Sequence, residues 1–199
     1  ASLDDPSLSR AAVDAMLLAG DNSGACSRVS SLVRSDPLPY WTKVLAFCRA
    51  LDNDNGAVSM AVALLRDQGH NDDEAFFTLV SALAGNSTAQ ITSLIDPEPL
   101  HLAMLRAAHQ TVPVDAVAGA RPAILSAIAT APNDEFSVRI EAAERAEAAG
   151  ALSTGVLADI YAAVPYTGDD IDVALQRAAA DEGAMANALL YQAAAVWEG

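Results

Sequence analysis

The chain has 199 residues, of which 52% are apolar and only 5% aromatic, and its formal charge is −15. This length and apolar content indicate one folded domain over residues 1–199. A chain with this negative charge would be repelled by the phosphate backbone of nucleic acids, so no nucleic-acid partner is expected. No apolar run approaches the roughly 20 residues that cross a bilayer, so no membrane insertion is expected either.

Short alanine-rich amphipathic segments, each ended by Gly or Pro, follow one another along the whole chain. Their period is that of helices, and nothing in the sequence indicates a strand. We therefore predict an all-α fold, a right-handed superhelix (α-solenoid) of about six antiparallel helical hairpins, with a globular helical bundle as the alternative. The first helices of the hairpins are expected to begin near residues 9, 39, 72, 98, 134 and 168.

Several helix boundaries can be predicted from capping residues. Pro39 suits a first helical position, Asp54 or Asn55 is expected to cap the following helix, and Ser153 is expected to cap a helix over 156–161. Gly20, Gly69, Gly85 and Gly150 are expected to end helices.

The third and fourth hairpins are less regular. Asn71 with Glu74 three residues later has the spacing of a capping box, and a second helix is expected through Ile91, Leu94 and Ile95. A loose helical turn is expected over residues 114–120.

The segment 39–69 resembles a tetratricopeptide repeat. Trp41 stands where that family places its first aromatic residue, and Ala57 stands sixteen residues later at its small second-helix position. Three other positions depart from the family pattern, since they hold Leu45, Cys48 and Gly69. The resemblance implies a superhelix whose concave face holds peptides or partner proteins.

Cys26 and Cys48 lie at similar distances from the turn at Asp36 and Pro37, each on the apolar face of its helix. Antiparallel helices would place the two residues at the same height, so a disulfide is one interpretation, and two small core residues are the other. A disulfide would indicate an oxidising compartment, so we expect a periplasmic or secreted protein, with the cytoplasm as the alternative.

Two acidic clusters raise the possibility of a helical metal-dependent enzyme. Asp72 and Asp73, like Asp169 and Asp170, stand where a helix is expected to begin, so capping explains them as well. The full aspartate motif of the helical isoprenoid synthases is missing. We therefore expect no catalytic residue, no metal site and no cofactor.

A second alternative is the non-catalytic helical segment of a bacterial cell-wall enzyme. The alanine-rich composition resembles the helical superstructure of lytic transglycosylases, but Glu135 is followed by Phe136 and not by the serine of their catalytic Glu-Ser pair. Since the sequence starts at Ala1 without an initiator Met, we expect a segment of a larger, exported protein.

Function is predicted only loosely by this architecture. We expect a non-catalytic interaction or scaffold module that binds a protein or peptide, with self-association as a further possibility. Adjacent aromatic residues point about 100° apart on a helix, so one member of each pair could lie at a groove edge. Tyr40 and Phe76 are the predicted partner-binding residues.

Overall fold

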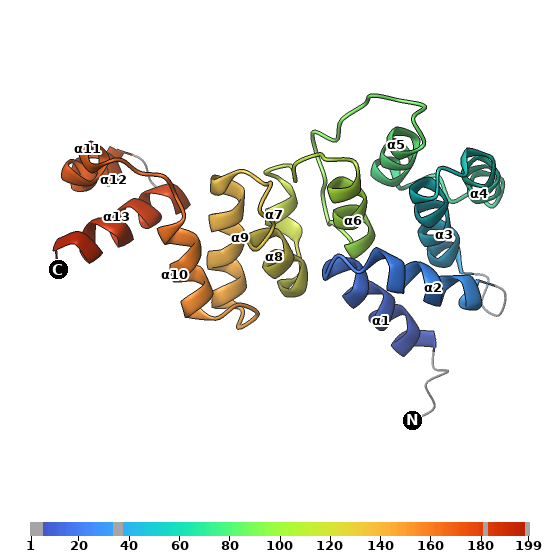
Figure 1. Ribbon diagram of the computed structural model, residues 1–199, viewed down its shortest axis with the longest axis horizontal. Coiled ribbons are helices and arrows are strands. Elements are labelled where there is room, and N and C mark those ends of the chain that lie inside the picture. Colours follow the sequence, from blue (N-terminus) through green and yellow to red (C-terminus); the bar gives the residue numbers. More distant parts are fainter. Residues whose placement is uncertain (1–5, 34–37, 181–182, 198–199) are drawn as a thin grey trace. The chain divides into compact units, whose positions relative to one another are not determined.

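The computed structural model describes residues 6–33, 38–180 and 183–197, and all regular secondary structure in these ranges is helical (Figure 1). The all-α prediction is therefore confirmed. The helices are α1 (Pro6–Leu18), α2 (Asn22–Leu32), α3 (Pro39–Leu51), α4 (Asn55–Asp67), α5 (Glu74–Leu83), α6 (Pro99–Ala107), α7 (Ala116–Gly119), α8 (Pro122–Ala129), α9 (Phe136–Ala148), α10 (Thr154–Ala162), α11 (Gly168–Asp172), α12 (Ala174–Ala180) and α13 (Ala184–Trp197).

The helices group into two compact units. Unit 1 is Ala1–Pro113 and holds α1 to α6, and unit 2 is Val114–Gly199 and holds α7 to α13. Each unit buries its own apolar side chains. The largest fully buried ones are Trp41, Phe47, Phe76, Leu17, Leu65, Leu79, Met104, Leu105 and Val13 in unit 1, and Ile124, Ile128 and Ile140 in unit 2.

The helix ends follow the predicted capping chemistry at several places. The Asp54 carboxylate accepts a hydrogen bond from the Ala57 N–H at the start of α4, and the Ser153 hydroxyl accepts one from the Val156 N–H at the start of α10. Gly69 ends α4 with a φ of 80°, a left-handed conformation that a glycine adopts at low cost.

Helix α5 begins two residues later than predicted. Its N-cap is Asp73, whose carboxylate accepts a hydrogen bond from the Phe76 N–H at 3.0 Å, so the predicted capping box between Asn71 and Glu74 is wrong. A carboxylate directly before the first turn satisfies a free N–H and opposes the positive end of the helix dipole. Asp73 is therefore a structural residue at the start of α5.

The predicted helix through Ile91, Leu94 and Ile95 does not form, and α5 is joined to α6 by the long loop drawn in green in Figure 1. Ser and Thr residues are frequent in this loop, and they favour local hydrogen bonds over helix. Five residues between Gln90 and Asp96 are also too few to nucleate a helix. Gln110 instead holds the loop, accepting from the Ile91 N–H and donating to the Ala89 carbonyl.

Unit 1 closes on itself, because α1 packs against α6 as well as against α2 (Figure 1). The Arg106 guanidinium of α6 donates to the Leu17 and Leu18 carbonyls at the end of α1. Both carbonyls lie in the last turn of α1, where Leu17 also accepts from the Gly20 N–H beyond the helix, and a cation there opposes the negative end of the helix dipole. These two hydrogen bonds connect parts of the chain that are 88 and 89 residues apart in the sequence.

A disulfide joins Cys26 of α2 to Cys48 of α3, with the two Cα atoms 5.7 Å apart. The disulfide interpretation is therefore confirmed, and it fastens the first predicted hairpin to the second. Such a bond is consistent with an oxidising compartment. No helix in the described ranges is both long enough and apolar enough to span a membrane.

In unit 2, α8 packs along α9, and α13 contacts α9, α10, α11 and α12. The loose turn expected over residues 114–120 is the short helix α7. The first helix of the last predicted hairpin is divided into α11 and α12 at Val173. Both pieces pack on α13, where Ile171, Ala174, Leu189 and Ala193 form a small core with Tyr166 against it.

Candidate functional site

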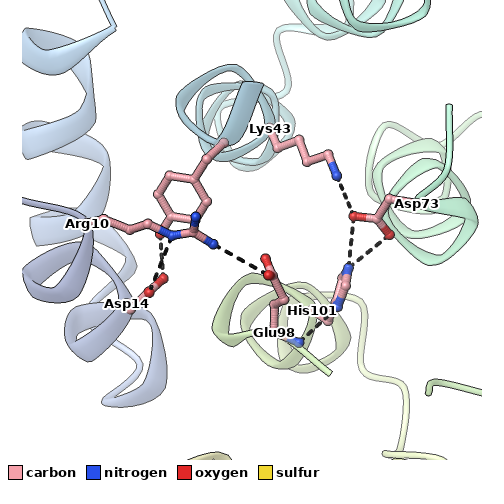
Figure 2. Close-up of polar contacts among 7 residues, drawn as sticks. Arg10, Asp14, Lys43, Asp73, Glu98 and His101 are labelled. Carbon is pink, nitrogen blue, oxygen red and sulfur yellow. Dashed lines mark hydrogen bonds and ion pairs between the residues drawn. The ribbon is translucent and has the colours of Figure 1, made fainter. Parts of the chain in front are cut away.

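Seven polar residues meet where four helices of unit 1 converge (Figure 2). We call them the polar cluster, and their interactions are hydrogen bonds and ion pairs between α1, α3, α6 and the start of α5. The members are Arg10 and Asp14 from α1, Tyr40 and Lys43 from α3, Asp73 at the cap of α5, Glu98 at the cap of α6, and His101 of α6.

Asp73 is the centre of one half of the polar cluster. Its Oδ2 accepts from Lys43 Nζ at 2.7 Å, and its carboxylate faces His101 Nε2 at 3.0 and 3.2 Å. Burial alone raises the pKa of Asp73, but the hydrogen bonds from His101, Lys43 and the Phe76 N–H outweigh it and hold the pKa well below its usual range. The carboxylate is therefore ionised at any pH above about 4.

The hydrogen bonds of His101 define its tautomer. Its Nδ1 accepts from the Glu98 N–H at 3.1 Å, so the ring proton is on Nε2, which donates to Asp73. The buried imidazole thus connects the first turn of α6 to the cap of α5. Both ring nitrogens are used in these bonds, so His101 has a clear structural role.

The other half of the polar cluster is built on Tyr40. Its hydroxyl donates to Asp14 at 2.6 Å, and Arg10 lies 4.3 Å from the centre of its ring while reaching Glu98 at 3.4 Å. Burial, followed by the hydrogen bond to the Asp14 carboxylate, raises the pKa of the Tyr40 hydroxyl, so it stays protonated. These interactions connect α3 to α1 through Tyr40 and Asp14, and α1 to the start of α6 through Arg10 and Glu98.

We expect Asp73→Asn to destabilise unit 1 at pH 7 by about 2 kcal/mol, because an amide loses the charged bonds to Lys43 and His101. The folded-state pKa of Asp73 is lowered, so its stabilising contribution is present above about pH 4, the unfolded value, and is lost as the pH falls further. The variant should therefore be closest to the wild type in acid. Urea unfolding at pH 7 and pH 3, followed by Trp41 fluorescence in a Trp197→Phe background, measures this.

The neighbouring carboxylate provides the matched control, since Asp72 is exposed and precedes the same helix. Asp72→Asn should change the free energy of unfolding by less than about 0.5 kcal/mol at either pH. An equal loss of stability in both variants would contradict the stabilising role of the Asp73 carboxylate.

The two aromatic residues predicted to bind a partner belong to this region. Tyr40 is 8% exposed and Phe76 is fully buried, so neither ring lies at the edge of an open groove. Each ring instead lies beneath a cation, Arg10 over Tyr40 and Lys43 at 5.5 Å from the centre of Phe76. Their adjacent residues, Trp41 and Phe77, contact them edge to face. Partner binding by Tyr40 and Phe76 stays a prediction, and the burial of the two rings does not support it.

The acidic clusters belong to different units, and each has a local role. Asp73 caps α5 and pairs with Lys43, and Asp170 forms a capping box with Thr167 at the start of α11 and pairs with Arg177. Among the described residues, no three His, Cys, Asp or Glu side chains are grouped so that they could hold a metal ion. The capping explanation of these aspartates is supported.

A groove with apolar walls lies on another side of unit 1, along α4. Its volume is about 570 Å³, within the range of ligand-binding cavities. We call it the α4 groove, and it is lined by Val33, Thr42, Leu45, Ala57, Met60, Ala61, Ala63, Leu64 and Asp67. Met60 is 75% exposed and Leu64 is 47% exposed, so two large apolar side chains face solvent in one place.

Two polar cavities of about 550 and 290 Å³ flank α5, and Glu74 and Thr78 line both. Their other walls come from the end of α4 and from the loop that Gln110 holds. Arg66 lines the larger cavity, with its guanidinium 5.2 Å from the centre of the Phe77 ring. The side chain of Arg66 is thus placed away from its neighbour Asp67, which lines the α4 groove.

Comparisons with family models, with curated proteins and with solved structures found no match to this chain. The α4 groove was not predicted as a site from the sequence. A signal was available, because Met60 and Leu64 are large apolar residues that fall outside the core face of Val58, Ala61, Val62 and Leu65.

Proposed function

We propose that this chain is a non-catalytic protein-interaction module and that the α4 groove is its contact surface. The observation that carries the proposal is the apolar lining of the groove together with the exposure of Met60 and Leu64. Large apolar side chains that gather at the surface of a folded protein mark sites of association. The partner we propose is a protein segment, whose apolar side chains would fill the groove.

The architecture supports a scaffold role. The first helices of the predicted hairpins begin at Pro6, Pro39, Glu74, Pro99, Phe136 and Gly168, a spacing that scatters around the roughly 34 residues of tetratricopeptide repeats. We propose that the helices form a helical-repeat scaffold, in which α5 stands without the second helix predicted for its hairpin. The Cys26–Cys48 disulfide supports its placement in the periplasm or outside the cell.

The metal-dependent alternative receives no comparable support. Asp73 caps α5 and pairs with Lys43, whereas Asp170 completes the capping box of Thr167 and pairs with Arg177, so these roles explain why the two carboxylates stand there. Neither aspartate therefore needs a metal ion to explain its position.

Selection of helical peptides from a display library against the folded chain tests the proposal. Enriched peptides should bind about tenfold more weakly to Met60→Glu/Leu64→Glu, because two charges would line a wall that the partner has to desolvate. Both side chains are exposed, so the variant should keep the wild-type circular dichroism spectrum.

Leu175→Glu is the matched control, because Leu175 is 64% exposed in unit 2 and lies outside the groove. It should leave the affinity of the selected peptides unchanged. Peptides that lose affinity equally in both variants, or a selection that enriches no groove-dependent peptide, would contradict the proposed function.

A further inference from the structure

The shape of the α4 groove indicates what kind of segment fits it. The residues of α4 that line it recur at the spacing of one helix face, from Ala57 through Ala61 and Leu64 to Asp67. At 1.5 Å per residue this face is about 15 Å long. That length matches about three turns of a partner helix, whose apolar side chains at positions i, i+3 or i+4, and i+7 point to one side.

An extended peptide fits the same surface less well. The groove is formed between helices, in which the backbone N–H and C=O groups are paired within each helix. An extended segment would bury its own backbone groups against walls that offer no partners, which costs free energy for each unpaired group. A helix pairs its backbone groups internally, so an apolar groove between helices favours a helix.

The side chains of the groove also suit a helix. Ala57 and Ala61 are small and leave room for larger side chains of the partner, whereas Met60 and Leu64 project beside them. Methionine is flexible and can adapt to the side chains it meets. The groove therefore has a shallow floor of alanines with an adaptable apolar rim.

Among the described residues that line the groove, charge is found at one end. Asp67 is the only charged residue among the described residues that line it, and it is the last residue of α4, where the helix dipole is negative. Its neighbour Arg66 lines the cavity beside α5, and Lys43, the only lysine of the sequence, pairs with Asp73. A positive charge on the partner would find a complementary group at Asp67.

From these observations we infer that the occupant of the α4 groove is an amphipathic helix of another protein, with apolar residues along one face and a Lys or Arg at the end that meets Asp67. The inference rests on the proposed function. A second copy of this chain is disfavoured as the occupant, because it would bring another formal charge of −15 to an acidic surface.

Three synthetic helical peptides of about 14 residues test the inference, four turns being enough to cover the groove. The first has Leu along one face and Lys at both ends, the second has Glu in place of Lys, and the third has the composition of the first in scrambled order. Affinities are measured by fluorescence anisotropy against the wild type, Asp67→Lys and Met60→Glu/Leu64→Glu. Because each of the first two peptides carries its charge at both ends, one charge can meet Asp67 whichever way the peptide helix runs along the groove.

The Lys peptide is expected to bind the wild type about fivefold more tightly than the Glu peptide, the size of effect typical of one exposed ion pair. Asp67→Lys should reverse the order of these two peptides, and added salt should reduce the difference. The scrambled peptide should bind more weakly than either of the ordered ones, because its apolar residues no longer share one face.

Failure of the inference and failure of the proposed function give different results. In one outcome, Met60→Glu/Leu64→Glu weakens binding, but the Lys and Glu peptides have equal affinities for the wild type and also for Asp67→Lys. The inferred partner chemistry is then wrong, and the groove keeps its proposed role. Binding that does not depend on Met60 and Leu64 overturns both. Light scattering at rising protein concentration that shows dimers lost in Met60→Glu/Leu64→Glu would overturn the inference in favour of a second copy.

Discussion

Removing the disulfide by Cys26→Ala/Cys48→Ala should lower the free energy of unfolding of unit 1 by about 3 kcal/mol. The bond joins residues 22 positions apart in the sequence and fastens α2 to α3. Without it the unfolded chain gains the freedom of a loop of this length, which is the main expected source of the effect. Alanine avoids placing an unpaired hydroxyl at Cys48, which is 6% exposed.

Urea unfolding followed by Trp41 fluorescence in the Trp197→Phe background measures this loss in unit 1, where Trp41 is fully buried. A reducing agent should shift the wild type to the midpoint of the double variant and should leave the variant unchanged. Labelling of the denatured wild type without reductant should find no free thiol. Coincident unfolding of the oxidised and reduced wild type would show that the disulfide does not stabilise unit 1.

The largest single-residue effect is expected for Trp41→Ala, at about 3–5 kcal/mol. Trp41 is fully buried in α3, and its ring lies edge to face with Tyr40 at a centroid distance of 4.8 Å. Removing the indole leaves a cavity at the helix that carries Cys48, Tyr40 and Lys43. The Tyr40 hydroxyl and its bond to Asp14 would lose their packing support, so unit 1 should unfold at a much lower urea concentration.

Trp197→Ala is the matched control, because Trp197 is 56% exposed in α13. The urea unfolding of both variants is followed by far-UV circular dichroism and not by fluorescence, because each variant lacks one of the two tryptophans. The control should stay within about 0.5 kcal/mol of the wild type. Similar losses in the two variants would show that Trp41 does not have the central packing role that its burial indicates.

The helix positions could be predicted well because their signals are local. Pro39, Asp54, Ser153 and Gly69 each act on the turn in which they stand, and each does so in the structure. The helix expected through Ile91 fails for a local reason too. Its apolar residues are periodic, but the surrounding Ser and Thr residues and the short run before Asp96 oppose helix formation.

The polar cluster could not be predicted, because its partners are far apart in the sequence. Lys43 and Asp73 are 30 residues apart, and Asp73 and His101 are 28 apart, so no spacing within one helix connects them. Only the packing of α3, α5 and α6 brings the three together. The sequence did indicate that Asp73 stands near the start of a helix. It also singled out Tyr40 and Phe76, but as partner-binding residues at the edge of a groove.

The contact of α1 with α6 makes the order of synthesis matter. The Leu17 and Leu18 carbonyls leave the ribosome long before Arg106, so the first helix has to wait for about 90 residues before its final neighbour exists. Contacts between such distant parts of a chain slow folding, because a long loop has to close first. We therefore expect unit 1 to acquire its native packing only after residue 107 has emerged, so that a nascent chain stalled earlier would present an unfinished, protease-sensitive N-terminal part.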